Sequence, residues 1–439
     1  MLLRYDKSDT HKGALVLPVP DMYSLLQVGS VLIGMDGDLT NELMAVFRDD
    51  MLTIETMSRR EYFELEGYSF DEIPPENLDG DIEIVRFGSP GRIISDRLDV
   101  IGVDPISALT QLDGYLSSRS DNKGSLNASQ FVEKLAACKE FFPFGDETDQ
   151  SVGSDHWLQF TIPNLGELYA LRIALLAFPD GEVILEFSGT SHGDHPSASD
   201  ARRAISGTAG MYAPAVVLTE GRTDAEFLTT ALKILYPHLV DLIRFLDYER
   251  KAEGGVSALV RMVNAFAAAG IVNRIIAAFD NDTAATDGLR ALKSANLPAQ
   301  IQVIRYPPID LANDYPTLGP PTVNFPNGSV SLANVNGLAG SIELYLGRDV
   351  LTQADGSLYP VQWTAYKPGV GQYQGEVVNK NTIQQAFRVK CVLALHKPSS
   401  VQEQDWEGLR LILDEIRGAA ISAFTQPRGT LALGSKSVS

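Results

Sequence analysis

The chain has 439 residues and a formal net charge of −20 at pH 7, and 44% of its residues are hydrophobic. This length and hydrophobic content predict two or three domains, each with its own core. The acidic balance argues against a free-standing protein that holds nucleic acid by charge alone, so a substrate of that kind would require a protein partner or an oligomer.

Hydropathy, the N-terminal residues and the cysteines bear on localisation. No apolar run approaches the roughly 20 residues needed to cross a membrane, and Met1–Lys7 lacks the apolar core of a signal peptide. Cys138 and Cys391 are far apart and show no zinc-binding spacing, so we expect buried thiols in a reducing compartment. These features predict a cytoplasmic protein without membrane contact.

The region before about residue 118 is organised differently from the rest. A Tyr/Phe-rich stretch, Tyr62–Tyr68, precedes two apolar segments, Ile82–Phe87 and Arg97–Val103. Ser117–Ser125 is rich in Ser, Asp, Asn and Gly, which predicts a loop. We interpret the region before this loop as an α+β domain.

The next region is predicted to contain one helix and one β-hairpin. The helix is Ala128–Phe141, and the strands are Leu168–Phe178 and Glu182–Phe187. Pro179-Asp180-Gly181 between the two strands is a turn signal. Gly189–Gly210 is rich in Ser, Gly and Ala and is predicted to link this region to the next domain.

Strand and helix patterns then alternate over about a hundred residues. The predicted strands are Val216–Leu218, Leu242–Leu246, Arg274–Phe279 and Ile301–Ile304, and the predicted helices contain Ala225 to Leu235, Val256 to Ala269, and Leu289 with Leu292. Such alternation predicts an α/β fold with a parallel sheet covered by helices. Ligands bind such sheets at the carboxyl ends of the strands.

Two acidic motifs lie at these strand ends. They contain Glu220 and Asp224, directly after the first strand, and Asp280 and Asp282, directly after the third. Residues two apart in an extended strand face the same way, so Asp280 and Asp282 can converge. Gly221 can adopt the backbone angles of the turn that separates Glu220 from Asp224.

Each motif also has a purely structural explanation. Thr223 and Glu226 form a capping box, and the helix dipole favours Asp224 in a first helical turn. Because both motifs occur together and in this order, we favour a site for Mg²⁺ or Mn²⁺, in which the cation offsets repulsion among the carboxylates. A two-metal site of this kind would activate water and stabilise the leaving oxygen of a phosphodiester.

The sequence Glu-Gly-Arg-Thr-Asp followed by Asp-Asn-Asp resembles the Toprim domain. That domain occurs in topoisomerases, bacterial primases, small ribonucleases and nucleases of the overcoming-lysogenization-defect family. The resemblance implies a Toprim-type sheet and a metal-dependent reaction on nucleic acid, with all four acids as metal ligands and Glu220, Asp280 and Asp282 as catalytic residues. No Walker motif is present, since Gly434–Ser437 is a polar tail, so the ATPase fused to many of these nucleases is not expected.

Pro307-Pro308 marks an irregular connection into a C-terminal extension. Further on, Ile342-Glu343 resembles a segment that follows the Asp-x-Asp region in nucleases of the overcoming-lysogenization-defect kind, with a lysine after it. The resemblance implies that Glu343 adds to the metal site and that Lys380, or else Lys367, neutralises charge in the transition state. The structural alternative is an acid in a first helical turn and solvent-exposed lysines.

The N-terminal region carries a second, shorter resemblance. Phe47–Asp50 together with Arg97–Gly102 is similar to the HEPN/Toprim-associated N-terminal domain of bacterial proteins. Such proteins couple this domain to a HEPN or a Toprim effector, which implies a role in phage defence and a protein partner or homo-oligomer formed through this domain. We interpret Arg97 and Asp99 as a structural ion pair at a helix cap.

The expected layout follows from these patterns. Residues 1–118 form the HEPN/Toprim-associated domain, 126–190 a helix with a β-hairpin, 211–312 the Toprim domain, 313–425 a C-terminal extension closed by a helix at Leu409–Ile416, and 426–439 a flexible tail. We expect a metal-dependent nuclease that cleaves DNA or RNA, tRNA included, in antiphage defence. The alternatives are a non-catalytic Toprim subunit for assembly or sensing, and a primase-like nucleotidyl transferase.

Overall fold

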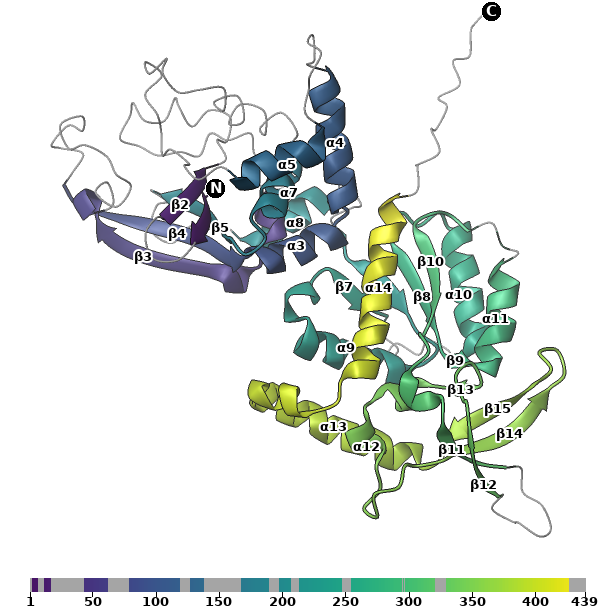
Figure 1. Cartoon of the computed structure of the whole chain (residues 1–439). Helices are drawn as coiled ribbons and strands as arrows, with labels where there is room; N and C mark the ends of the chain where they lie inside the picture. Colours follow the sequence, from purple (N-terminus) through teal and green to yellow (C-terminus); the bar gives the residue numbers. More distant parts are fainter. Residues whose placement is uncertain are drawn as a thin grey trace, which may run out of the picture. The chain divides into compact units, whose positions relative to one another are not determined.

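The structure is a computed structural model in which the chain forms two compact units, Met1–Tyr212 and Ala213–Ser439 (Figure 1). It describes residues 2–6, 12–16, 43–61, 79–118, 127–137, 167–188, 197–206, 213–246, 254–293, 295, 297–319 and 329–425. The aromatic stretch Tyr62–Tyr68, Cys138 and the predicted tail therefore lie outside the described residues. Across the described ranges, every helix is too short or too polar to span a membrane.

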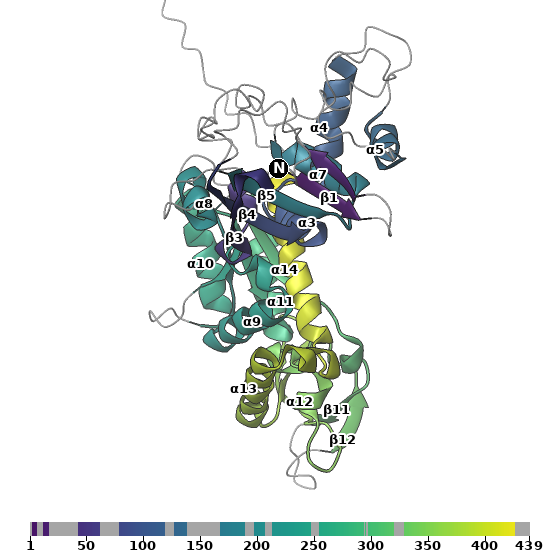
Figure 2. The same ribbon diagram turned by 90° about the vertical axis from the view of Figure 1, so that its left-hand side faces the viewer.

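The first unit is built on a five-stranded antiparallel sheet of order β2-β1-β5-β4-β3. Its strands are β1 Leu2–Asp6, β2 Lys12–Val16, β3 Leu52–Ser58, β4 Asp81–Pro90 and β5 Glu182–Ser188. Its helices are α3 Gly91–Val100, α4 Pro105–Ser118, α5 Ala128–Ala137, α7 Glu167–Ala177 and α8 Ala198–Ser206, with a 3-10 turn η2 at Asp49–Met51. Figure 2 shows β3, β4 and β5 side by side. The unit thus combines an antiparallel sheet with helices, and it includes both the region predicted as an α+β domain and the predicted helix-and-hairpin region, since β5 lies in the same sheet.

The predicted β-hairpin is wrong in its first half. The segment Leu168–Phe178 forms helix α7, and β5 pairs with β1 and β4 instead. The segment is apolar at almost every position, so neither alternation nor helical periodicity distinguishes a strand from a buried helix. Its Leu and Ala residues favour the helix that forms. The predicted linker Gly189–Gly210 is also partly wrong, because α8 lies within it.

Two buried arginines hold the segment that precedes β3. Arg97 and Arg202 both donate to the carbonyl oxygen of Phe47, at 3.1 and 2.7 Å. Asp99 forms an ion pair with Arg172 on α7. The structure thus brings together Phe47 and Arg97, which belong to the two N-terminal sequence phrases, and it uses Arg97 and Asp99 structurally.

The second unit contains a four-stranded parallel sheet of order β10-β8-β6-β7. Its strands are β6 Ala215–Leu218, β7 Ile243–Phe245, β8 Ile275–Phe279 and β10 Ile301–Arg305. The helices that follow the first three strands are α9 Arg222–Leu235, α10 Val256–Ala268 and α11 Thr283–Lys293, with a 3-10 turn η6 at Pro237–Leu239. The predicted alternation and the parallel α/β sheet are confirmed. The observed strands begin and end within two residues of the predicted ones.

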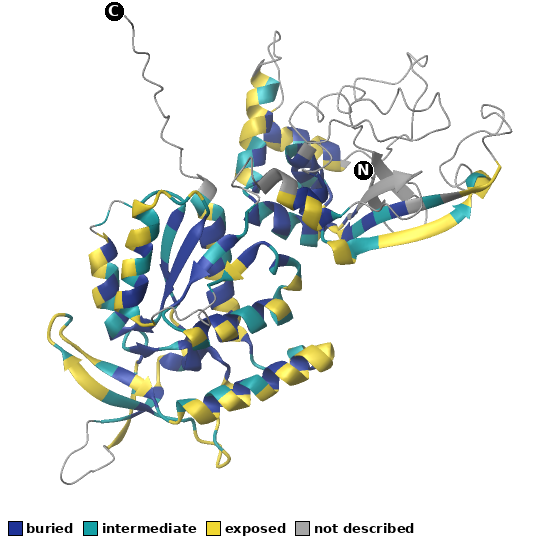
Figure 3. Cartoon of the chain, turned by 180° about the vertical axis from the view of Figure 1, so that it is seen from behind, coloured by how far each residue is buried: buried dark blue, intermediate teal, exposed yellow. Residues whose placement is uncertain are grey.

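Helices cover the sheet. Leu259 and Val263 of α10 share one core with Leu292 of α11 and with the strands, where every residue of β8 is buried (dark blue in Figure 3). Helices α9 and α14, Glu407–Thr425, pack on the other side of the sheet (Figure 1). The closing helix predicted at Leu409–Ile416 is confirmed as part of α14.

The remainder of the second unit folds against the carboxyl ends of the parallel strands. A second sheet has the order β12-β11-β14-β15, and a two-residue pairing joins β9 to β13. These strands are β9 Asn281–Asp282, β11 Tyr315–Leu318, β12 Val330–Ala333, β13 Ala339–Gly340, β14 Val361–Lys367 and β15 Gln372–Val377. The remaining helical segments are η8 Asp310–Ala312, η9 Ile342–Tyr345, α12 Arg348–Leu351, α13 Lys380–His396 and η10 Pro398–Glu403.

Candidate functional site

Glu220 follows β6 in a tight turn before α9. Its Oε1 accepts a 3.0 Å hydrogen bond from the backbone amide of Asp280, which follows β8. Gly221 is the N-cap of α9. A Cβ on Gly254 would lie 3.2 Å from the carbonyl oxygen of Glu220, so the segment before α10 approaches the turn closely. The two strand ends that carry the predicted motifs are therefore bonded to each other.

Asp282 is oriented by two protein donors. Its Oδ1 accepts from the amide of Ala285 at 2.7 Å, and its Oδ2 accepts from Nε2 of Gln374 on β15 at 2.6 Å. The first bond caps the start of α11. Asp280 differs, because its buried Oδ1 has no hydrogen-bond partner among the described residues. A buried carboxylate oxygen without a donor is costly unless a proton or a cation satisfies it.

Asp224 and Glu343 complete the acidic group from the first turns of α9 and η9. Both are almost fully buried, at 7% and 4% exposure. Glu343 accepts from Oγ of Ser341 at 2.7 Å and from Nε2 of Gln384 at 2.8 Å. Lys380, at the start of α13, places Nζ 3.9 Å from Oε2 of Glu343. Lys380 is therefore the lysine at the acids, whereas Lys367 lies at the end of β14 opposite Gln372.

The acids perturb one another strongly. Burial and the charge of Asp282 raise the pKa of Glu220 to about 8, and burial and the charge of Glu343 raise the pKa of Asp224 to about 7. Burial, Asp224 and Glu220 raise the pKa of Asp280 well above its usual value. Shifts in this direction mean that the group as it stands would bind a proton or another cation.

Two residues at the carboxyl end of β10, Arg305 and Tyr306, join this site, and neither was predicted from the sequence. Arg305 donates from Nη2 to the carbonyl oxygen of Asp282 at 2.7 Å, which holds the Asp-x-Asp turn. The hydroxyl of Tyr306 is buried and lacks a hydrogen-bond partner in the described part of the chain. Burial, and then the charges of Asp224 and Asp280, raise the pKa of Tyr306 well above its usual value. The position of Arg305 and Tyr306 at the carboxyl end of a strand of the same parallel sheet is the signal that could have identified them.

The acids are close together without forming a finished metal cage. Within the described ranges, no group of three or more His, Cys, Asp or Glu side chains is arranged to hold a metal ion. The physical reason is visible in the bonds above: protein donors orient Glu220, Asp282 and Glu343 individually. Cation binding would therefore require side-chain rotation, for which the unpartnered oxygen of Asp280 offers a starting ligand.

Comparisons with known proteins give no further identification. No family model matches the chain, and neither a curated protein nor a solved structure matches it.

Proposed function

We propose that the chain is a Toprim-type nuclease that cleaves phosphodiester bonds of nucleic acid with Mg²⁺ or Mn²⁺. The observation that carries this proposal is the gathering of five carboxylates at the carboxyl edge of a parallel sheet, where burial and their mutual charges raise the pKa values of Glu220, Asp224 and Asp280. Ligands of parallel sheets bind at that edge. A dense group of carboxylate oxygens suits a hard divalent cation such as Mg²⁺, which prefers oxygen ligands.

The residues present supply the hard oxygen donors that such a cation prefers, provided that their side chains rotate toward it. Glu220, Asp280 and Asp282 would hold it, together with Asp224 and Glu343, and the buried, unpartnered Oδ1 of Asp280 is the feature that most needs a cation. When bound, the cation supplies Lewis-acid chemistry, since it activates water and offsets the negative charge of a phosphodiester.

The protein's own contributions are positioning and charge. Gln374 and Gln384 orient Asp282 and Glu343, and Arg305 holds the Asp-x-Asp turn through the carbonyl oxygen of Asp282. Lys380 is partly exposed, with its ammonium 3.9 Å from Glu343. It can therefore face solvent on one side and the acids on the other, and stabilise negative charge that develops on a phosphate.

The biological role is part of the same proposal. An effector in bacterial antiphage defence would cleave only when triggered. Residues 1–118, which resemble a domain shared by effectors of different chemistry, would engage a regulator or further copies of the chain. The net charge of −20 supports a partner, because phosphate contacts alone would give this chain little affinity for nucleic acid.

The deciding experiment is incubation of the purified full-length chain with Mn²⁺ or Mg²⁺ and plasmid, linear DNA, single strands or tRNA. We expect cleavage that EDTA abolishes and that Glu220→Gln reduces by at least about a hundredfold. Glu415→Gln removes an exposed carboxylate on α14 and is the matched control, which should cleave normally. Wild-type cleavage by Glu220→Gln would refute the proposal, and incorporation of nucleotides by the wild type would instead assign nucleotidyl transfer.

A further inference from the structure

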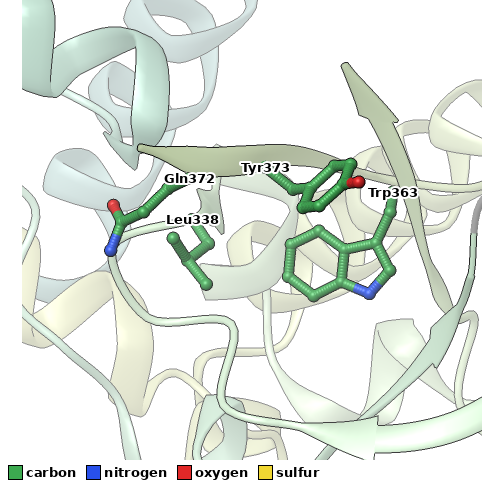
Figure 4. A pocket seen from close by; sticks show the side chains of 4 residues that line it. All are labelled: Leu338, Trp363, Gln372 and Tyr373. Atoms are coloured by element: carbon green, nitrogen blue, oxygen red, sulfur yellow. The ribbon is translucent and has the colours of Figure 1, made fainter. Parts of the chain in front are cut away.

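A cavity of about 370 Å³ lies beside the β14–β15 hairpin and is lined by Leu338, Trp363, Gln372 and Tyr373. Figure 4 shows the rings of Trp363 and Tyr373 next to each other, with Leu338 and Gln372 across from the indole. The cavity has the size of a small-molecule site, with two aromatic walls, one aliphatic wall and one amide. Neither the acidic group nor the sequence motifs account for it.

Strand register places three aromatic side chains on one face of this hairpin. Trp363 pairs with Gly375 and Tyr366 pairs with Tyr373, and the register shifts between Trp363 and Tyr366. Residues three apart normally face opposite sides of a strand, so this irregularity is what returns Tyr366 to the face of Trp363. The rings of Tyr366 and Tyr373 meet edge to face at 5.2 Å, although the two residues are 53% and 46% exposed.

The glycine opposite Trp363 sets the position of the indole. A Cβ on Gly375 would lie 2.8 Å from the Cβ of Ala339 and 3.2 Å from Cε3 of Trp363. Only a residue without a side chain allows the indole to lie against β15 and leave the cavity open. The aromatic wall is therefore built into the strand pairing rather than made by a mobile surface side chain.

Strand β15 contributes residues both to the cavity and to the acidic group. Tyr373 lines the cavity, and Nε2 of the next residue, Gln374, donates to Oδ2 of Asp282 at 2.6 Å. The carbonyl oxygen of Tyr373 accepts from Oγ1 of Thr283, which directly follows Asp282, at 2.7 Å. A ligand held in the cavity would be adjacent to the strand that orients a carboxylate of the candidate site.

We propose that this cavity binds one unpaired nucleobase of a polynucleotide whose backbone enters the acidic site. This inference rests on the proposed function and specifies the form of its substrate. Aromatic walls stack on the flat face of any base, and the amide of Gln372 can both donate to and accept from a base edge. A base inside a duplex is stacked and paired on all sides, so only a single strand, a frayed end or an extruded base can enter.

The negative charge of the chain favours an uncharged base over an anionic occupant. In a chain of net charge −20, affinity for nucleic acid has to come mainly from contacts that do not depend on phosphate. Two cations do lie at this hairpin. Lys367 lies opposite Gln372 in the register of β14 and β15. Arg290 donates to the carbonyl oxygen of Gly369 at 2.6 Å and also forms an ion pair, in which its Nη1 lies 3.7 Å from Oδ1 of Asp287. They provide local contacts for a phosphate on either side of the bound base.

The test is binding of the full-length chain in EDTA, where the proposed cleavage cannot occur. The probes are a fluorescein-labelled oligothymidylate of about 12 nucleotides, its oligouridylate equivalent, an abasic strand with the same phosphates, and a fully paired hairpin. We expect the thymidylate or uridylate strand to bind at least about tenfold more tightly than the abasic strand and the hairpin. The DNA and RNA probes separate the two sources of the base.

Variants test whether the aromatic residues of the cavity cause the preference for strands with bases. Tyr373→Leu and Trp363→Leu should abolish the preference for the strand with bases, whereas Tyr373→Phe, which keeps the ring, should retain it. Val389→Ser removes an exposed aliphatic side chain from α13 and is the control for non-specific loss of apolar surface. Because Tyr373 is half exposed, its two variants remain informative even if the Trp363 variant fails to fold.

Failure of this inference differs from failure of the proposed function. Equal binding of the abasic and thymidylate strands, or unchanged affinity in Tyr373→Leu, overturns the base pocket while metal-dependent cleavage can still stand. A change of oligomeric state in Tyr373→Leu with unchanged affinity would assign the cavity to a second copy of the chain and equally overturn it. Cleavage unaffected by Glu220→Gln would instead refute the nuclease site. The ratio of the affinities for the thymidylate and abasic strands would still show whether the cavity binds a base.

Discussion

The backbone amide of Asp280 donates a 3.0 Å hydrogen bond to Oε1 of Glu220. This bond joins the ends of β6 and β8, so the side chain of one acid fixes the backbone of the next. Glu220 therefore has a structural role besides its proposed chemical one. Glutamine keeps an acceptor oxygen at this position and removes the charge, which makes Glu220→Gln the variant that separates the two roles.

A divalent cation should stabilise the folded chain. Mg²⁺ or Mn²⁺ that binds only the native state should add about 2.7 kcal/mol to the free energy of unfolding at a hundredfold excess over its dissociation constant. Thermal melts with and without the cation measure this gain. The double variant Asp280→Asn with Asp282→Asn should lose it, and Glu415→Gln should keep it. Melting temperatures that do not respond to millimolar Mn²⁺ would favour a non-catalytic role.

The metal-free protein should become less stable as the pH rises. Burial and Asp282 raise the pKa of Glu220 from 4.5 to about 8, so the folded state holds this proton more tightly than the unfolded state does. The associated stability is complete below about pH 4.5 and is lost as the pH rises through about 8. One such group changes the free energy of unfolding by at most about 1.4 kcal/mol per pH unit.

Urea unfolding in EDTA between about pH 5 and 8.5 measures this slope. Other carboxylates contribute to it, so the comparison is between the wild type and Glu220→Gln, which lacks this proton. The stability advantage of the variant should grow with pH. Parallel pH profiles for the two proteins would show that Glu220 is not perturbed in this way.

Lys390→Met should destabilise the second unit. Burial lowers the pKa of Lys390, but its ammonium donates to the carbonyl oxygen of Leu346 and to Asp349, both at 2.9 Å. Methionine fills similar space and leaves the carbonyl oxygen of Leu346 without this donor, while the side chain of Asp349 is 38% exposed and can be hydrated, so we expect a loss of about 1–3 kcal/mol. Lys397→Met, at the exposed end of α13, is the control and should change the free energy of unfolding by less than about 0.5 kcal/mol. Equal stabilities would contradict the buried role.

Two glycine-to-alanine changes should have opposite signs. A Cβ on Gly288 in α11 would lie 2.3 Å from Cγ1 of Val256 in α10, so Gly288→Ala should overpack that contact and destabilise by about 1–3 kcal/mol. A Cβ on Gly418 in α14 would meet no atom within 4 Å, so Gly418→Ala should stabilise by about 0.5–1 kcal/mol through helix propensity alone. Chemical denaturation of both variants measures the difference. Stabilisation by Gly288→Ala would show that α10 and α11 can separate at no cost, and destabilisation by Gly418→Ala would contradict the open position of that residue.

The parallel sheet could be predicted because its strands are short apolar runs bounded by turns and its helices show a 3.6-residue period. Leu168–Phe178 was wrongly predicted as a strand, because apolar residues occupy nearly every position and no hydrophobic periodicity distinguishes a helix from a strand there. Patterning distinguishes elements only when one face is polar. A segment buried on all sides has to be identified by length and by tertiary context.

The acids themselves could be predicted from strand-end positions, whereas the residues that orient them could not. Gln374 is 92 residues from Asp282, and Gln384 is 41 residues from Glu343. Glutamines on an exposed hairpin or a helix carry no distinguishing pattern, and only the three-dimensional pairing of β15 and α13 brings them to the acids. Arg305 and Tyr306 could have been predicted, since they lie at the carboxyl end of a strand of the same sheet.

The pairing of β13 with β9 limits how this fold can be divided. Ala339 pairs directly with Asp282, and a Cβ on Gly340 would overlap Asn281, so residues from the extension are part of the backbone that carries the Asp-x-Asp motif. A fragment ending near residue 312 would retain four acids and lose Glu343, Lys380 and the strands that support them. Transplanting the site to another scaffold, or recombining it with a relative, would therefore succeed only with crossover points outside the whole segment from β6 to α13.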